Sequence, residues 1–384
     1  MVPEVAGSIP VDRPKALFVV TRLAQQTNPP LKLCYDVSCA MPAVFDLPDF
    51  DEHEAVHHFH DRASGLSAVI AVHSTALGPA AGGTRFWHYA DSAQAVTDAL
   101  RLSRGMSYKN AMAGLPAGGG KAVILADDAA TKTPAMLVAF ARAVDALGGR
   151  YITAQDVGMS EADMVAFSTV TPHVAGLPGL GGNPGPSTAC GVFLGVKAAI
   201  KRALGRDELR DVHVAIQGVG SVGGGLARLL AAEGARLTLA DVDHTRAARL
   251  ADELGAKTVS SQAILGVSAD ILSPCALGAI LTDETIAALD VAAVAGGANN
   301  QLATDAQGAE LFARGILYAP DYVINAGGII NVLRHLGQGG DAEVAARIDG
   351  IPSRLNAIWD ESAATGVPPA QVADRMAQKL IGRG

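Results

Sequence analysis

Two lysines twelve residues apart, Lys109 and Lys121, are the residues of this chain whose type and setting best suit chemistry. They stand in the segment RGMSYKNAMAGLPAGGGK (104–121), which is dense in glycine and nearly free of other charges. An ammonium group that apolar and glycine-rich walls keep from water loses stabilisation, so its pKa falls toward the range of a general base. A nearby carboxylate or oxyanion would keep the second lysine charged. The alternative for either lysine alone is a solvated surface position.

The residues around the two lysines predict how each is held. Apolar residues recur at helical spacing from Ala95 to Met106, so Lys109 is expected on a rigid helix. Gly118–Gly120 directly precede Lys121, and the backbone there is expected to approach a bound molecule beside a cleft. A short buried strand is expected at 122–125.

A carboxylate, Asp156, follows a strand that is predicted at 151–154. Ligand-facing residues tend to lie at the carboxyl ends of strands in an open α/β sheet, which makes Asp156 a candidate site residue. A role as a helix N-cap or in a turn is the alternative. A helix is predicted at 133–148, and the segment LGPAAGG (77–83) is expected to break regular structure.

The composition restricts the class of protein. Charged residues make up 18% of the chain and the net charge is −8, which argues against nucleic acid or an anionic membrane as partner. No apolar run reaches the length of a membrane span, and the first residues lack the pattern of a signal peptide. The cysteines show no metal-type spacing and are expected to be unpaired in a reducing compartment: Cys34, Cys39, Cys190 and Cys275. A cytoplasmic enzyme acting on a small molecule fits best.

The sequence HEAVH at 53–57 matches the HExxH pattern of zinc proteases, which requires a helix. The surrounding residues instead predict two strands joined by a glycine-containing turn. On a strand the two histidines would lie about 13 Å apart, too far to share one metal. No metal site is expected, and the histidines are expected to be solvated.

A second strong signal lies in the other half of the chain. A buried strand at 212–217 runs into a GxGxxG motif, GVGSVG at 218–223, and the residues after it predict a helix. The next strand ends at Asp241, 23 residues after the first glycine. This is the dinucleotide-binding pattern in its proper context, with Gly218, Gly220, Ser221, Val222 and Gly223 at the pyrophosphate and Asp241 at the adenosine ribose. The acid would repel a 2′-phosphate and neither Val242 nor Asp243 supplies a cation, so NAD is favoured over NADP.

These signals predict an α/β protein of two domains, the second a doubly wound Rossmann domain. Residues 1–40 have five prolines and no sustained period, and are expected to be a tail. The first domain is expected at 41–180 and the NAD domain at 181–325. The segment 176–186 is rich in glycine and proline and predicts a hinge. Helices at 326–384 are expected to pack back on the first domain.

Seven segments together resemble the glutamate/leucine/phenylalanine/valine dehydrogenase family, in order and with matching spacing from about residue 42 to 380. They are GPAAGG (78–83), MSYK (106–109), GGGK (118–121), the strand ending at Asp156, the GxGxxG with Asp241, GGANN (296–300) and DYVINAGGIIN (321–331). The resemblance implies an N-terminal domain for substrate binding and oligomerisation, an NAD domain, and a cleft that closes between them. A homo-oligomer is therefore expected.

The resemblance also implies roles for single residues. Lys109 would bind the substrate α-carboxylate, Lys121 would be the base that activates water, and Asp156 would handle the amino group. The substrate cleft would further include Gly82, Gly83, Met106, Ala81, Ala154 and Ile329, while Thr188 and Asn299 would reach the nicotinamide. The implied reaction is oxidative deamination of an L-amino acid, with hydride transfer from Cα to NAD.

The choice of amino acid depends on the side-chain pocket. Glutamate-specific members resemble this chain but have a lysine in place of Ala81 and a small polar residue in place of Ile329. An apolar pocket does not compensate the burial of an unpaired carboxylate, so an apolar substrate of the leucine, valine or phenylalanine type is expected. Glutamate dehydrogenase activity, another Rossmann oxidoreductase acting without ammonia, and a non-catalytic NAD-responsive binding protein remain as alternatives. Gln155 departs from the glutamate that is common beside the catalytic aspartate.

Overall fold

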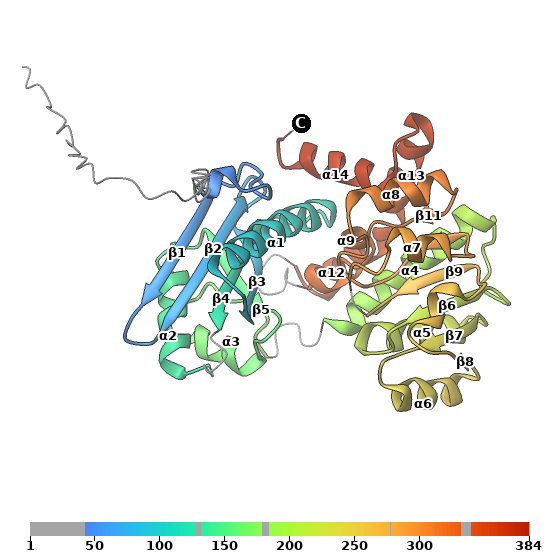
Figure 1. The fold of residues 1–384 in the computed structure, drawn as a ribbon, viewed down its shortest axis with the longest axis horizontal. Coiled ribbons are helices and arrows are strands. Elements are labelled where there is room, and N and C mark those ends of the chain that lie inside the picture. The colour runs from blue at the N-terminus through green and yellow to red at the C-terminus, as the bar shows by residue number, and fades with distance from the viewer. Residues whose placement is uncertain (1–42, 127–131, 179–183, 277, 332–338, 384) are drawn as a thin grey trace, which may run out of the picture. The chain divides into compact units, whose positions relative to one another are not determined.

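A five-stranded mixed sheet forms the first half of the protein in the computed structural model, which describes residues 43–126, 132–178, 184–276, 278–331 and 339–383. The strand order is β1-β2-β4-β3-β5, with β1 and β2 as the expected antiparallel hairpin and β4, β3 and β5 parallel (Figure 1). The strands are β1 (Ala55–Asp61), β2 (Leu66–Ser74), β3 (Ala80–His88), β4 (Gly118–Ala126) and β5 (Tyr151–Gln155). The tail predicted at 1–40 lies outside the described residues.

The segment that was expected to break regular structure does so only at 77–79, because strand β3 begins at Ala80; for residues 80–83 the prediction is wrong. The glycines of this strand permit close contact between neighbouring elements rather than a turn. A Cβ at Gly82 would lie 1.7 Å from the carbonyl oxygen of Gly120 in β4. A Cβ at Gly83 would lie 2.8 Å from the Cβ of Asp156. The sequence does not distinguish a glycine pair inside a strand from one inside a turn. The atoms that require glycine at these positions belong to residues far along the chain.

The three glycines before Lys121 also belong to a strand, β4, which begins four residues before the predicted start at 122. A Cβ at Gly119 would lie 2.0 Å from the amide nitrogen of Ser107, and one at Gly120 would lie 2.7 Å from the ring of Tyr151. The helix α1 (Ser92–Met112), predicted correctly, can therefore lie directly on the sheet. This contact holds the helix that carries Lys109 at a fixed distance from the strand that carries Lys121.

Replacing Gly119 with alanine should destabilise the fold strongly, because the added methyl group would overlap backbone atoms of α1 that cannot rotate away. We expect a loss of about 3 kcal/mol or more, at or above the usual range for overpacking, visible as a lower thermal unfolding temperature. Gly105→Ala on the same helix is the control, because nothing lies within 4 Å of its added Cβ. Alanine favours a helix by about 1 kcal/mol over glycine, so this variant should unfold at an equal or higher temperature. Equal unfolding temperatures for the two variants would contradict the close contact.

Two helices complete the first half. The helix α2 (Pro134–Asp145) confirms the helix predicted at 133–148, with the side chain of Thr133 accepting a hydrogen bond from the amide of Met136. The helix α3 (Glu161–Ser168) was not predicted. Its signal was present in the sequence, because Ser160 and Asp163 form a reciprocal capping box at its start.

A six-stranded parallel sheet forms the second half, in the order β11-β10-β9-β6-β7-β8. With β6 counted as the first strand, this is the 3-2-1-4-5-6 order of a dinucleotide-binding fold, so the predicted doubly wound sheet is confirmed. The strands are β6 (His213–Gln217), β7 (Arg236–Ala240), β8 (Lys257–Thr258), β9 (Ile271–Pro274), β10 (Ala293–Val294) and β11 (Leu317–Tyr318). The helices include α4 (Gly185–Leu204), α5 (Ser221–Ala232), α6 (His244–Leu254), α7 (Asp283–Ala287), α8 (Asp305–Ala313), α9 (Asp321–Ile324) and α10 (Gly327–Ile330).

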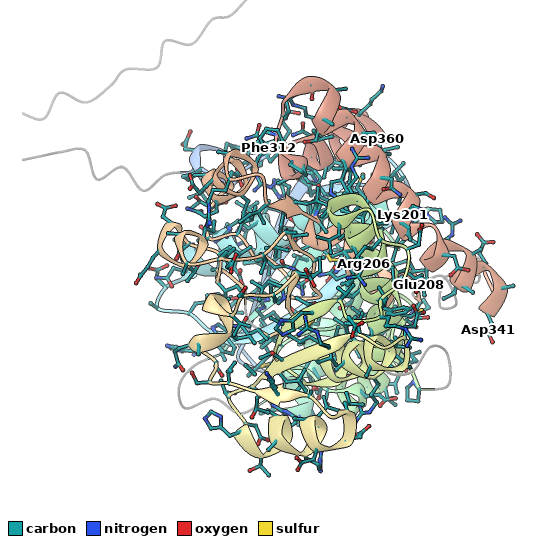
Figure 2. All side chains as sticks on the ribbon, turned by 90° about the vertical axis from the view of Figure 1, so that its right-hand side faces the viewer. Lys201, Arg206, Glu208, Phe312, Asp341 and Asp360 are labelled. Atoms are coloured by element: carbon teal, nitrogen blue, oxygen red, sulfur yellow. The ribbon has the colours of Figure 1, made fainter. Side chains whose placement is uncertain are left out.

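Charged side chains lie on the surface of the second half and of the last helices. Figure 2 labels Lys201, Arg206, Glu208 and Asp360, all of which are exposed. Arg202 of α4 pairs with Asp360 of the helix α13 (Ile351–Thr365) and so joins two helices that are distant in sequence. In the described part of the chain, none of the helices combines the length and the apolar character that crossing a membrane requires.

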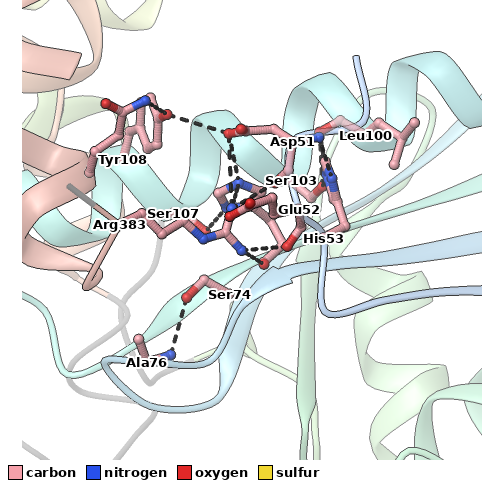
Figure 3. Close-up of polar contacts among 12 residues, drawn as sticks. Asp51, Glu52, His53, Ser74, Ala76, Leu100, Ser103, Ser107, Tyr108 and Arg383 are labelled. Atoms are coloured by element: carbon pink, nitrogen blue, oxygen red, sulfur yellow. Dashed lines mark hydrogen bonds and ion pairs between the residues drawn. The ribbon is translucent and has the colours of Figure 1, made fainter. Parts of the chain in front are cut away.

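The last helices contact the first half of the chain. Residues Ala43–Gly384 accordingly form one compact unit. The last helices are α12 (Asp341–Asp349), α13 and α14 (Pro369–Leu380). The side chain of Gln378 in α14 donates to the hydroxyl of Tyr108 in α1 at 3.0 Å. Arg383 donates to the carbonyl oxygens of Asp51, Glu52 and His73 at 2.6, 2.6 and 2.8 Å (Figure 3). These hydrogen bonds hold the end of the chain beside α1. The domain boundaries themselves stay a prediction.

The HEAVH segment starts a strand, as expected, but His53 is not solvated. It is buried, and its Nε2 lies 3.0 Å from both the carbonyl oxygen of Leu100 and the hydroxyl of Ser103 (Figure 3). Burial lowers the pKa of His53, so the neutral ring is favoured. Among the residues that the structure describes, no three histidine, cysteine, aspartate or glutamate side chains are grouped to hold a metal ion.

Candidate active site

Buried Lys121 and partly buried Asp156 form an ion pair on the first sheet. The Nζ of Lys121 lies 2.8 Å from Oδ2 of Asp156, and only 6% of Lys121 is exposed. Lys121 is on β4 and Asp156 directly follows β5, with β3 between these strands. The pair can form across β3 because Gly83, opposite Ala154 in register, has no side chain.

Burial and charge act in opposite directions on this pair. Burial lowers the pKa of Lys121, and the negative charge of Asp156 only partly opposes this effect. Burial alone would raise the pKa of Asp156, but Lys121 and Arg85 outweigh it and hold this pKa below its ordinary value. The site therefore keeps Asp156 ionised while it brings Lys121 closer to losing its proton at neutral pH.

Lys109 lies in the last turn of α1, where the two halves of the chain meet. Its Nζ donates to Oδ1 of Asn299 at 3.4 Å, and Asn325 donates to the same oxygen at 2.9 Å. Burial lowers the pKa of Lys109 to about 8, with Asp321 favouring its charge and Lys121 opposing it. Because the charge of Lys121 lowers the pKa of Lys109, the two amines are close enough to influence each other's protonation.

The expected substrate-side residues come from four elements. Ala81 of β3 is buried in an apolar cluster with Tyr108 and Ala111 of α1, and Ile329 of α10 packs against the same cluster. Met106 reaches the sheet at Gly82, where a Cβ would lie 3.2 Å from its Cγ. The remaining two residues, Gly83 and Ala154, are neighbours in β3 and β5.

The glycines of the GxGxxG motif have the geometry that a dinucleotide requires. Gly218 has a φ of +86°, which a tight turn needs and which other residues rarely adopt. A Cβ at Gly223 would lie 1.9 Å from the carbonyl oxygen of Gly218, so this glycine allows α5 to pack closely. A Cβ at Gly220 would meet no atom within 4 Å. The space before α5, which begins with Ser221 and Val222, is thus open to a pyrophosphate.

Asp241 lies at the end of β7 as predicted, but a cation accompanies it. Arg246 in the first turn of α6 donates to both carboxylate oxygens, at 2.8 and 3.3 Å. The amides of Val219 and Asp243 donate to the same carboxylate at 2.8 and 2.9 Å. Neither Val242 nor Asp243 supplies a cation, but the start of α6 brings Arg246, the fifth residue after Asp241, to this carboxylate. A ribose hydroxyl would have to displace the half-exposed Arg246.

Thr188 lies in the first turn of α4, and its hydroxyl donates to the carbonyl oxygen of Pro184 at 2.8 Å. The helix α10 packs against this turn, because a Cβ at Gly328 would lie 2.7 Å from the hydroxyl of Thr188. Asn299 follows β10, and Val222 of α5 approaches the same loop, at 2.8 Å from a Cβ built on Gly297. Thr188, Asn299 and Ile329 thus come from segments that surround the carboxyl ends of the second sheet.

Four residues near the two lysines were not identified as site residues from the sequence. Arg85 of β3 donates to Oδ2 of Asp156 at 3.1 Å and to Asp98 at 2.8 Å, and the hydroxyl of Tyr89 donates to Asp98 at 2.5 Å. Asp321 lies across from Lys109, and burial raises its pKa. Arg85 could have been recognised as a charged residue inside an otherwise uncharged strand. The strand itself was not predicted, because a break in regular structure was expected at 77–83.

Two family models match the chain. The first, described as the Glu/Leu/Phe/Val dehydrogenase dimerisation domain, covers residues 53–173, and the second, described as Glutamate/Leucine/Phenylalanine/Valine dehydrogenase, covers residues 238–339. The leucine dehydrogenase of Geobacillus stearothermophilus is 46% identical over 333 residues, which are 86% of this chain and 91% of that protein. This chain belongs to the glutamate/leucine/phenylalanine/valine dehydrogenase family.

Two further comparisons agree with the membership in this dehydrogenase family. The valine dehydrogenase of Streptomyces albus is 47% identical over 335 residues, or 86% of this chain and 92% of that protein. The crystal structure of L-tryptophan dehydrogenase from Nostoc punctiforme matches with a TM-score of 0.78 and 41% identity, covering 86% of this chain and 96% of that chain. The resemblance inferred from the sequence, the two-domain α/β fold and the enzyme class of amino-acid dehydrogenases are confirmed for this family member.

Proposed function

We propose that this dehydrogenase catalyses the NAD-dependent oxidative deamination of an apolar L-amino acid to the 2-oxo acid and ammonia. The observation that carries the proposal is the buried pair of Lys121 and Asp156 at 2.8 Å, with Lys109 beside it at the contact with the second sheet. Two amines and one acid are the groups that this reaction needs at the substrate. The open space at Gly220 supports a dinucleotide in the second half of the chain.

Each charged residue has a separate task in this proposal. Cationic Lys109 binds the α-carboxylate and thereby orients Cα. Ionised Asp156 accepts hydrogen bonds from the substrate amino group and takes up its proton. Lys121 in its neutral form removes a proton from water as the water attacks the iminium carbon. NAD, when bound, accepts the hydride from Cα. The products are a 2-oxo acid, ammonium, NADH and one further proton.

Two of the residues expected on the substrate side support an apolar side chain on the substrate. Ala81 is 3% exposed within an apolar cluster, and Ile329 packs against that cluster. Burying a carboxylate there without a partner would cost several kcal/mol, which disfavours glutamate. The similar proteins are named leucine, valine and L-tryptophan dehydrogenases, so substrates of this chain are proposed from small branched to aromatic. A methylene changes selectivity by only about 1 to 3 kcal/mol, which leaves the ranking to measurement.

The test is NADH formation with a panel of L-amino acids: leucine, isoleucine, valine, phenylalanine, tryptophan and glutamate. We expect NADH and ammonia in equal amounts with at least one apolar member, and much less with glutamate. The proposal fails if no member gives ammonia-linked NADH. NADH with a 2-hydroxy acid and without ammonia would instead support a different oxidoreductase, and NAD binding without any turnover would support a binding protein.

Asp241 and Arg246 together predict the cofactor preference. With Asp241 present, the carboxylate repels a 2′-phosphate and Arg246 is engaged by it, so NAD is the proposed cofactor. Asp241→Ala should weaken NAD binding and free the guanidinium to pair with the 2′-phosphate of NADP. We expect the ratio of kcat/KM for NADP to that for NAD to rise about 100-fold. The double variant Asp241→Ala/Arg246→Ala should lose the gain with NADP, and retention of that gain would contradict the role of Arg246.

Assembly and location remain proposals. The model that matches residues 53–173 is described as a dimerisation domain, and we propose that this part of the chain forms a homo-oligomer. Light scattering of the purified protein measures its mass directly. A cytoplasmic location stays a prediction from the sequence.

A further inference from the structure

Two cationic side chains bind the same oxygen of the Asp156 carboxylate. The Nζ of Lys121 and the Nε of Arg85 lie 2.8 and 3.1 Å from the same atom, Oδ2. Arg85 comes from β3, which lies between β4 and β5, so it approaches Asp156 from a different element than Lys121 does. Two cations on Oδ2 restrict the rotation of the carboxylate, to which the backbone amide of Val157 also donates. Among the described residues, both cations bind Oδ2, so Oδ1 is the oxygen without a cationic partner.

We propose that Arg85 is a positioning residue that orients Asp156, so that Oδ1 receives the amino group of the substrate. This inference rests on the proposed function, in which Asp156 binds that group. Arg85 does not itself touch the substrate in this proposal. It holds the carboxylate in place when Lys121 gives up its own proton and can no longer bind Asp156 as a cation.

A second carboxylate, that of Asp98, binds the guanidinium group of Arg85. The Nη1 of Arg85 donates to Oδ2 of Asp98 at 2.8 Å, and Tyr89 donates to the same oxygen at 2.5 Å. The side chains of Arg85 and Asp98 are 24% and 23% exposed, so water screens this pair only in part. An arginine fork held by two carboxylates is oriented more strictly than one held by a single partner.

The helix α1 connects the contact between Asp98 and Arg85 with the residue that binds the other end of the substrate. Asp98 and Lys109 both lie on α1, eleven residues apart, which is close to three helical turns, so they share one face. Lys109 binds the substrate carboxylate, while Asp98 acts through Arg85 on the acid that binds the amino group. One helix therefore sets the distance between the two groups that grip the α-carbon.

The charged groups around Lys121 and Asp156 determine in which direction each substitution should shift the pH dependence of activity. Lys121 faces Asp156, Arg85, Asp98 and, from α1, Lys109, while Asp156 faces Lys121 and Arg85. Arg85 lowers the pKa of both Lys121 and Asp156, whereas Asp98 raises the pKa of Lys121. Deamination needs Lys121 neutral and Asp156 ionised, so activity rises with pH through both ionisations. Removing Arg85 should move the acid limb of kcat/KM to higher pH, and removing the charge of Asp98 should move it to lower pH.

The experiment compares the pH profiles of wild-type protein, Arg85→Ala, Asp98→Asn and the control Arg101→Ala. Arg101 lines the same surface hollow as Arg85, but its side chain is 59% exposed and pairs only loosely with Asp49, at 3.7 Å. We expect Arg85→Ala to lower kcat/KM by about 10- to 100-fold, the range for residues that orient another group, and to move the acid limb up by about one pH unit. Arg101→Ala should leave both unchanged.

Chemical rescue separates positioning from general damage. The hollow is lined by Arg85, Trp87, Tyr89 and Asp98, so the site vacated in Arg85→Ala opens to solvent. Guanidinium ion at millimolar concentration should restore part of the activity of this variant and none in Arg101→Ala. Lost activity with an unchanged pH profile and no rescue would overturn the proposal, as would a wild-type profile in Arg85→Ala. If Arg85→Ala does not fold, the downward shift in Asp98→Asn decides alone, and its absence would overturn the proposal.

A measurement without turnover separates this inference from the proposed function. Trace acetylation of lysines at different pH values, read by mass spectrometry, measures the pKa of Lys121 in the protein without substrate. A higher pKa of Lys121 in Arg85→Ala than in wild-type protein supports the electrostatic role even if no amino acid is oxidised. An unchanged pKa of Lys121 overturns it, whatever the activity of the wild-type protein.

Discussion

Lys121→Ala should lower kcat by about 1,000-fold or more, within the range for loss of a general base, while the affinities for the 2-oxo acid and for NAD stay close to those of the wild-type protein. Alanine cannot take the proton of the attacking water, so hydrolysis of the iminium becomes slow. Asp156 keeps one cationic partner, Arg85, at 3.1 Å and so stays ionised and in place. Steady-state kinetics and fluorescence titration with NADH measure the two effects separately.

Lys132→Ala is the matched control for Lys121→Ala. Lys132 also pairs with a carboxylate of the first half, Asp163, but its side chain is 25% exposed and that carboxylate caps α3. We expect a lower unfolding temperature with kcat unchanged. Similar losses of kcat in both variants would show that the loss of any buried ion pair in this half disables the enzyme, which would contradict the assignment of Lys121 as the base.

Lys109→Ala should act mainly on substrate affinity. Removing a cation that binds a partly buried carboxylate costs about 2 to 4 kcal/mol, or about 30- to 1,000-fold in affinity. We expect the KM for the amino acid and the dissociation constant of the 2-oxo acid to rise by this factor, with a smaller effect on kcat. A kcat loss as large as that of Lys121→Ala with unchanged KM would mean that the two lysines have been assigned to the wrong roles.

The pH dependence of binding gives an independent reading of Lys109. Burial lowers the pKa of this lysine to about 8, so below that pH it is charged and binds the carboxylate, and above it the charge is lost. The affinity for a 2-oxo acid, which has no amino group of its own to titrate, should therefore fall as the pH rises above about 8. Lys109→Arg keeps its charge over this range and should remove the dependence. Isothermal calorimetry between pH 6 and pH 10 measures it.

Local patterns in the chain were sufficient to predict several elements of both halves. The helix before Lys109, the GxGxxG motif between a strand and a helix, and Asp241 at the next strand end all depend on residues within about 25 positions of one another. Such features follow from hydrophobic periodicity and turn chemistry, which act over short distances along the chain. The acid at the end of β5 was found in the same way.

Only the tertiary structure decided what the glycines do and which charges meet. Gly82 and Gly119 are required by backbone atoms of Gly120 and Ser107, and nothing in their own sequence neighbourhood distinguishes this from a turn. Arg85 reaches Asp156, 71 residues further along the chain, because β3 lies between β4 and β5. Coulomb interactions and steric overlap depend on distance in space, so the types of residue needed for deamination could be read from the sequence, while their pairing and protonation required the fold.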